Sequence, residues 1–421
     1  MLMTQKLRQD LDDYKAKFHQ VELELNAILE ITQAINNNTP EASLYMMYKF
    51  TLRGNLHIER LALYVLEEEW ECKVHFGTPS QFARQPLELE ALVGVHDIGR
   101  VAELPFQNSA FRAFDFVIPV MHKDRVLAYV FVNQYRLGQD RYRKEVDARF
   151  VQTLSNIILV AIENKKLVRR QINQEAFKKE MEIAQKVQSL LFPKKLPHTP
   201  QLHIKATYFP HDLIGGDYYD YIPLPGKKFI ICIADVSGKG VPAALLMSNF
   251  QASLRTLARQ TEDLLQIVEE LNHTIYENAQ GEHFITFFVA LYDPTEATLQ
   301  YINAGHNPAY FYDQQKAEAR LLDKGTTVLG IWSPLPFIEK ETLRNLNGFF
   351  LFAYTDGVTE VVNAEEEQFG IDRLIAFLKS RRQTELSEMH GHLITRINNF
   401  KKNQAFPDDI TLLSCRVMPQ S

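Results

Sequence analysis

The run Phe229-Ile-Ile-Cys-Ile-Ala-Asp235 is an unbroken apolar stretch that ends on an aspartate. The run Phe349-Phe-Leu-Phe-Ala-Tyr-Thr-Asp356 repeats this arrangement, and Asp408-Asp-Ile-Thr-Leu-Leu413 inverts it by placing two acids before the apolar residues. Short apolar runs between polar residues predict buried strands. Because helix-like segments alternate with them, we expect residues 198–421 to form an α/β sandwich of two largely antiparallel sheets flanked by helices.

Acidic residues therefore stand at several strand ends, and Gly215-Gly216-Asp217 opens the series. A single aspartate at a strand end is usually a cap or turn residue. Several beside buried strands need a joint explanation, because a buried carboxylate is costly unless it is paired or bound to a metal. Hard divalent cations take oxygen ligands and retain waters, and two ions about 3.5–4 Å apart can clamp a phosphoryl group. The pattern predicts a binuclear Mg2+ or Mn2+ centre.

Two glycine-rich loops accompany these acids. Gly215 and Gly216 allow close approach of the backbone to an anion, while Ser237-Gly238-Lys239-Gly240 joins the Asp235 strand to a helix that begins near Pro242. The loop amides and the helix N-terminus favour phosphate, although Lys239 could equally be a solvated loop lysine. A nucleotide P-loop is not matched, because Gly240 follows Lys239 and the upstream glycine is missing. Kinase signatures are also absent from the sequence.

Five motifs follow one another along the last part of the chain: Ile214–Asp220, Ala234–Gly240, Asn303–Asn307, Tyr354–Glu360 and Asp408–Thr411. Their residues and order resemble the SpoIIE/RsbU-like branch of the protein phosphatase 2C (PPM) family. The likeness extends over roughly residues 185–417.

The resemblance implies a metal-dependent serine/threonine phosphatase with a PPM-type α-β-β-α sandwich, in which water is the nucleophile. Asp217 would bind one metal or its waters, and Asp235 would bridge both ions with the Val236 carbonyl as a further ligand. Asp356 and Asp408 would hold the other ion, with Asp409 as the alternative to Asp408. These four aspartates, Asp217, Asp235, Asp356 and Asp408, are thus the expected catalytic residues.

The sequence departs from the eukaryotic-type pattern at two positions. Gly216 stands where those enzymes carry a glutamate, and Ser237 stands where they carry a histidine thought to act as general acid. The general acid is therefore open. His306 is a candidate for this role, or for supporting the phosphate site, and its alternative is a plain turn histidine.

The N-terminal residues 1–36 carry a heptad pattern that predicts a coiled-coil helix and a parallel homodimer. The alternative is a single amphipathic helix packed on the next domain. The pattern ends at Asn36-Asn-Asn-Thr-Pro40. Its apolar positions are Leu7, Leu11, Tyr14, Phe18, Val21, Leu25, Ile28 and Ile35.

Residues 37–162 resemble a GAF-like α/β sensor domain, whose ligand the sequence leaves open. Strands are expected at 57–66, 72–76, 116–121 and 125–132, with a turn at 122–125 and a helix at 150–162. Residues 163–197 are expected to be a helical linker. A heptad begins in the preceding helix and continues into this linker. Its apolar positions are Val151, Leu154, Ile158, Ala161, Val168 and Ile172, and the pattern then shifts by one residue before Ala176, Ile183, Val187 and Leu190. We hypothesise that this helix transmits a signal; an inert connector is the alternative.

The bulk properties exclude several classes. The net charge of −6 gives no general attraction to nucleic acid or anionic membrane, and no apolar run approaches the ~20 residues of a membrane span. Three scattered cysteines argue against disulfides and zinc, so a cytoplasmic protein is expected. The expected substrate is a bacterial regulatory phosphoprotein, by resemblance an anti-sigma-factor antagonist. The alternative function is a non-catalytic dimeric sensor or interaction protein.

Overall fold

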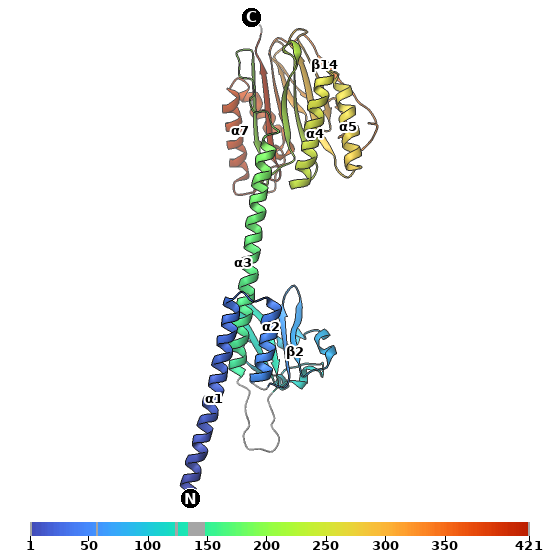
Figure 1. The fold of residues 1–421 in the computed structure, drawn as a ribbon. Coiled ribbons are helices and arrows are strands. Elements are labelled where there is room, and N and C mark those ends of the chain that lie inside the picture. The colour runs from blue at the N-terminus through green and yellow to red at the C-terminus, as the bar shows by residue number, and fades with distance from the viewer. Residues whose placement is uncertain (1, 56–57, 123–124, 134–147, 420–421) are drawn as a thin grey trace. The chain divides into compact units, whose positions relative to one another are not determined.

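The computed structural model describes residues 2–55, 58–122, 125–133 and 148–419 (Figure 1). The chain divides into two compact units, Met1–Glu175 and Ala176–Ser421. Helix α3 (Ala148–Ser189) continues through the boundary between them. The division into four segments remains a prediction.

The first unit contains a five-stranded antiparallel sheet in the order β2-β1-β5-β4-β3. Its strands are β1 (Leu61–Leu66), β2 (Trp70–Phe76), β3 (Gly99–Arg100), β4 (Phe116–His122) and β5 (Arg125–Val132). The four predicted strands are confirmed, although β1 begins at Leu61. The predicted turn between β4 and β5 includes residues 123 and 124, which lie outside the described residues.

Both faces of this sheet are covered. One face packs on α1 (Leu2–Asn36), α2 (Glu41–Phe50) and the first turns of α3, and the other packs on short helices of the 76–115 segment. Leu61, Leu63 and Val65 therefore point to one core, while Ala62 and Tyr64 point to the other. The likeness to a GAF domain remains a prediction.

Helix α1 is exposed along its first part and packs on its own domain near its end. The heptad positions Leu7, Leu11, Tyr14, Phe18, Val21 and Leu25 are exposed in the single chain. Near the C-terminal end, Ala27, Ile31 and Ala34 are buried in the core of the first unit, and the heptad positions Ile28 and Ile35 pack against the same core, partly buried. The last third of α1 thus packs on its own domain, as the alternative interpretation allowed, and the coiled coil remains a prediction for the first two thirds.

Helix α3 is continuous from Ala148 to Ser189, so the predicted helix at 150–162 and the helix of the 163–197 linker form one element, which ends at Ser189. Val151, Leu154 and Ile158 are buried in the core of the first unit, so these heptad positions are explained by packing within the domain. The later apolar positions are exposed in the single chain: Val168, Ile172, Ile183, Val187 and Leu190.

The second unit is the predicted sandwich of two sheets (Figure 1). One sheet has the order β13-β10-β9-β8-β7, with β14 paired to β10, and the other has the order β12-β11-β15-β16-β6. All pairs are antiparallel except β10 with β13. The strands of the first sheet are β7 (Tyr218–Pro223), β8 (Phe229–Val236), β9 (Ile285–Asp293), β10 (Thr298–Ala304), β13 (Gly325–Thr326) and β14 (Glu341–Leu343). Those of the second are β6 (Leu202–Phe209), β11 (Ala309–Asp313), β12 (Glu318–Leu322), β15 (Phe349–Tyr354) and β16 (Ile410–Val417).

Helices cover the outer face of each sheet. Helices α4 (Gly240–Gln260) and α5 (Leu264–Ala279) pack on the first sheet, and α6 (Gly370–Arg381) and α7 (Leu386–Lys401) pack on the second. In β8, Ile230, Cys232 and Ala234 face the helices, while alternate residues face the other sheet. This burial on both faces explains the continuous apolar run in the sequence.

The three cysteines are free, and Cys232 and Cys415 are buried. Among the described residues, the helices include none that combines the length and the hydropathy needed to cross a bilayer.

Candidate metal centre

The strand ends bring the predicted acids to one edge of the sandwich. Asp217 directly precedes β7, and Asp235 is the penultimate residue of β8. Asp356 follows β15 and begins a short 3-10 helix (Asp356–Val358), while Asp408 and Asp409 precede β16. The negative charges of Asp356, Asp408 and Asp409 repel the Asp235 carboxylate, so these carboxylates form one electrostatic cluster.

Asp217 lies deepest in this cluster, with 1% of its surface exposed. The hydroxyls of Thr355 and Thr411 both donate to its Oδ2, at 2.9 and 2.5 Å. Burial, followed by repulsion from Asp235 and Asp409, raises the pKa of Asp217 well above its usual value. The two threonines were not singled out from the sequence, although both stand inside the quoted motifs and fix the orientation of this carboxylate.

Ionisation of Asp235 and Asp356 is also unfavourable when no cation is bound. Burial, together with Asp356, Asp408 and Asp409, raises the pKa of Asp235 to about 8. Burial is also the main reason that the pKa of Asp356 is raised, with Glu360 and Asp408 adding to the effect. A cluster of carboxylates in which each opposes the ionisation of the next is stabilised by bound cations.

Asp408 and Asp409 are adjacent in sequence but differ in their contacts. The Asp409 Oδ1 accepts the His211 amide at 2.6 Å, and its Oδ2 accepts the amides of Gly216 at 2.8 Å and Asp217 at 3.4 Å. Asp408 instead makes an ion pair with Lys239 at 3.1 Å and is 38% exposed. Asp409 is therefore occupied in holding the 211–217 loop, whereas Asp408 is more open.

The glycines of that loop are required by close packing. A Cβ on Gly215 would lie 2.0 Å from the Asp409 Oδ2, and a Cβ on Gly216 would lie 2.9 Å from the Val236 carbonyl oxygen. Any side chain at Gly215 would displace Asp409. The close approach also sets the Val236 carbonyl beside the loop that carries Asp217.

The second glycine-rich loop lines the same hollow as the acids. Gly215, Gly216, Asp235, Gly238, Lys239 and Asp408 are among the residues around it. The Lys239 ammonium donates to the Pro407 carbonyl at 2.7 Å, so it bridges this loop to the segment before β16. The Ser237 hydroxyl accepts the Phe284 amide at 2.9 Å and thereby holds the end of β8 to the start of β9.

His306 lies behind the acids and does not line this hollow. Its Nδ1 is 2.8 Å from the hydroxyl of Thr286, the residue that pairs with Asp235 across β8 and β9. Burial lowers the pKa of His306 to about 4, with a smaller opposing effect from the Tyr354 main chain. The imidazole is therefore neutral at neutral pH and holds the strands that carry the acids.

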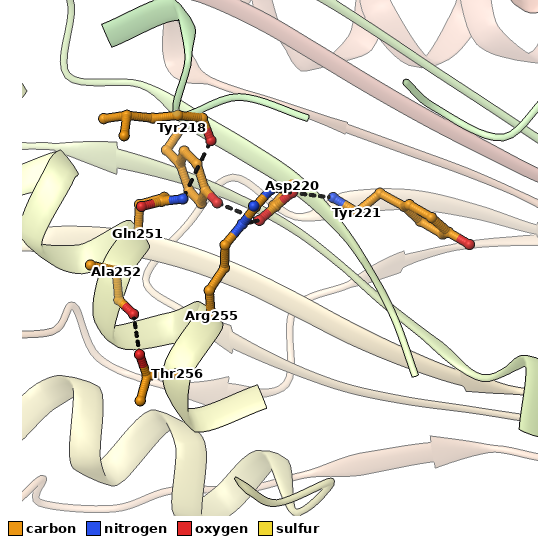
Figure 2. Close-up of polar contacts among 8 residues, drawn as sticks. Tyr218, Asp220, Tyr221, Gln251, Ala252, Arg255 and Thr256 are labelled. Carbon is orange, nitrogen blue, oxygen red and sulfur yellow. Dashed lines mark hydrogen bonds and ion pairs between the residues drawn. The ribbon is translucent and has the colours of Figure 1, made fainter. Parts of the chain in front are cut away.

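The strand that follows Asp217 is fixed by an ion pair between the buried Asp220 and the half-exposed Arg255 (Figure 2). The Arg255 guanidinium on α4 donates to both oxygens of Asp220, at 2.7 and 3.0 Å, and the Tyr218 hydroxyl donates to the same carboxylate. Asp220 has no exposed surface. Because β7 begins directly after Asp217, this clamp holds α4 and the acid-bearing loop in one arrangement.

The C-terminal end of α3 also reaches this loop. The Gln188 side-chain amide donates to the Gly215 carbonyl at 2.7 Å, and the Gly215 amide donates back to the Gln188 Oε1 at 3.4 Å. The Leu191 carbonyl accepts a bond from Gln251 on α4 at 3.4 Å, the contact drawn beside Gln251 in Figure 2. The end of α3 is thus attached both to the Gly215–Asp217 loop and to α4.

The sequence of this chain was compared with protein families and with known proteins. The family model described as Stage II sporulation protein E (SpoIIE) matches residues 225–418. Phosphoserine phosphatase RsbU of Bacillus subtilis (strain 168) is 31% identical over 247 residues, which are 58% of this chain and 71% of RsbU. This chain belongs to the SpoIIE family. Its second unit is thus a PP2C-type phosphatase domain, and enzymes of this type depend on Mg2+ or Mn2+.

Two further relatives agree with the SpoIIE family. Phosphoserine phosphatase RsbP of B. subtilis (strain 168) is 24% identical over 236 residues, covering 55% of this chain and 56% of RsbP. The SiaA-PP2C domain of Pseudomonas aeruginosa, 19% identical, superposes with a TM-score of 0.52 over 59% of this chain and 99% of that domain. The latter likeness establishes the PPM-type fold of the second unit.

Proposed function

We propose that this chain is a metal-dependent phosphatase that hydrolyses phosphoserine or phosphothreonine on a bacterial regulatory protein, an anti-sigma-factor antagonist. The observation that carries the proposal is the electrostatic cluster of Asp217, Asp235, Asp356 and Asp408. Two of these acids, Asp235 and Asp408, line a hollow together with glycines of both loops. The names of RsbU and RsbP as phosphoserine phosphatases support the reaction. Their likeness covers 58% and 55% of this chain, and the substrate class is proposed from the resemblance.

The donor set fits two hard cations. Asp217, Asp235, the Val236 carbonyl, Asp356 and Asp408 offer only oxygen ligands. Burial and repulsion between neighbouring carboxylates raise the pKa of Asp217, Asp235 and Asp356, and bound cations would offset this repulsion. Among the described residues, no three of these carboxylates offer atoms all within 4.8 Å of one another. Each ion would therefore take one or two carboxylates and complete its shell with the carbonyl and waters.

Bound Mg2+ or Mn2+ would supply charge neutralisation and activation of water for phosphoryl transfer. The residues of this chain do the positioning. Thr355 and Thr411 orient Asp217, and Asp409 fixes the Gly215–Asp217 backbone rather than serving as a ligand. Lys239 stands at the rim of the hollow, where its ammonium can attract the substrate phosphate. His306 is buried and neutral, so we assign it a supporting role and no proton transfer.

The test is phosphate release from a serine-phosphorylated anti-sigma-factor antagonist. We expect release with Mn2+ or Mg2+, none with EDTA, and a loss of at least about 100-fold for Asp235→Asn. Asp323→Asn is the matched control, because Asp323 is exposed and lies outside the cluster. Equal rates for the wild type and Asp235→Asn would remove the acidic centre from the mechanism.

We further propose that the N-terminal unit regulates catalysis through α3. The supporting observation is the pair of hydrogen bonds between Gln188 and Gly215, next to the metal-binding loop. Movement of the end of α3 would shift the Gly215 backbone and with it Asp217. Gln188→Ala should lower Mn2+ affinity and release, whereas Gln185→Ala, an exposed neighbour, should not. Unchanged Mn2+ dependence in Gln188→Ala would leave α3 as an inert connector.

A further inference from the structure

A histidine pair lies in the second unit, on the turn that precedes β6. His198 and His203 face each other across this turn and form an isolated bridge. The His198 Nδ1 is 2.6 Å from the His203 Nε2. The Thr199 amide donates to the Leu202 carbonyl at 2.9 Å, and the Leu202 amide donates to the Thr199 hydroxyl at 3.0 Å, so the turn holds both rings in place.

The start of α7 contributes a carboxylate to this pair. Glu385 is the N-cap of α7, and its Oε2 accepts the Glu388 amide at 3.0 Å. Its Oε1 lies 3.5 Å from the His203 Nε2. The cap fixes the carboxylate, and the oxygen that does not serve the helix faces the histidines.

The three groups together have the dimensions of a metal site. The ligand atoms of His198, His203 and Glu385 all lie within 4.8 Å of one another, and no other residues of the described ranges form such a group. Two imidazoles and one carboxylate are a known donor set for Zn2+ sites that keep an open position. We propose that His198, His203 and Glu385 bind Zn2+ or a similar first-row transition ion, at a site separate from the acidic centre.

The environment selects the class of ion. Burial, followed by the charge of His198, lowers the pKa of His203; Glu385 opposes this effect, and Arg416 and Lys205 add to it. The two facing ring nitrogens share a hydrogen bond, which a bound ion would replace by coordination to both rings. The same two cations disfavour ions held by charge alone, whereas imidazole nitrogen suits Zn2+, Ni2+ and Cu2+ far better than Mg2+. The bound ion would tie the start of β6 to the start of α7.

The experiment is equilibrium dialysis of the full chain against micromolar Zn2+ with millimolar Mg2+ present to occupy the acidic centre. We expect the wild type and Asp235→Asn to retain one Zn2+ per chain. Glu385→Gln, which keeps an oxygen for the helix cap, and His203→Ala should bind it more weakly by at least roughly 10-fold. His273→Ala is the control, because His273 pairs with Glu277 and lies outside the three-residue group, so this variant should retain the ion.

Circular dichroism of the metal-free variants establishes that each is folded before it is compared. Retention of the same Zn2+ by Glu385→Gln and His203→Ala would overturn the proposal, as would a wild type that retains none. Loss of Zn2+ in Asp235→Asn but not in His203→Ala would place the ion at the acidic centre and would also overturn it.

Discussion

The raised pKa of Asp235 predicts that a substitution at the metal centre stabilises the metal-free protein. Folding moves the pKa of this carboxyl from its ordinary 3.8 to about 8. Between these pH values the folded chain holds a proton that the unfolded chain has released, so the free energy of unfolding falls as the pH rises from about 4 to about 8. Asp235→Asn removes the titrating group, and the metal-free variant should lose this part of the pH dependence.

The size of the effect follows from the shift. A solution at pH 7 is about 3 pH units above the pKa of this carboxyl in the unfolded chain. At 1.36 kcal/mol per unit, the destabilisation of the folded state has an upper value of about 4 kcal/mol. Neighbouring carboxylates such as Asp356 and Asp408 share the repulsion. We therefore expect Asp235→Asn to stabilise the EDTA-treated protein by about 1–3 kcal/mol at pH 7, and by much less at pH 4.5. With excess Mg2+ the wild type should become more stable than Asp235→Asn, because Mg2+ stabilises only the protein whose site is intact.

Urea unfolding measures the difference in stability between the wild type and Asp235→Asn. The signal comes from the catalytic unit alone if that unit holds the only tryptophan. The chain has two tryptophans, Trp70 and Trp332, and only Trp332 lies in the second unit. A Trp70→Phe background, with Asp323→Asn as control, isolates the required signal. The reasoning is refuted if Asp235→Asn is less stable than the wild type in EDTA at pH 7, or if Mg2+ stabilises both proteins equally.

Three further changes probe the scaffold. Arg255→Met should cost about 2–4 kcal/mol in urea unfolding because it leaves the buried Asp220 without its cation, and adding Asp220→Asn should recover part of this loss; no change would show the pair to be unimportant. Gly215→Ala should lower phosphate release by about 100-fold, because its Cβ would displace Asp409; a normal rate would contradict the packing. Phe18→Glu should convert a dimer to a monomer in analytical ultracentrifugation, and a monomeric wild type would refute the proposed coiled coil.

The sandwich and the position of the acids could be predicted because both depend on local pattern. The apolar run that ends at Asp235 is a strand buried on two faces, and such a run differs clearly from a helix stripe. The order of the motifs then brings the strand ends together. The different roles of Asp408 and Asp409 were not predictable, because they depend on which carboxylate the amides of His211 and Gly216 reach.

Other features depend on contacts between segments that are far apart in sequence. The heptad of α1 does not show where the helix stops being exposed: Ala27, Ile31 and the heptad position Ile28 pack on the core of the first unit, and this depends on the sheet beneath them. Gln188 stands in a polar helix and is indistinguishable by pattern from its neighbours until Gly215 is placed beside it. Small and polar residues of this kind carry little periodic signal, so tertiary structure decides their role.

The central claim is tested most directly by measuring binding and turnover of one phosphorylated anti-sigma-factor antagonist in parallel. With Mn2+ the wild type should bind the phosphoprotein and release its phosphate. With EDTA, or with Asp235→Asn, it should bind but release none. Binding without release under every metal condition would contradict the account and identify a non-catalytic interaction protein.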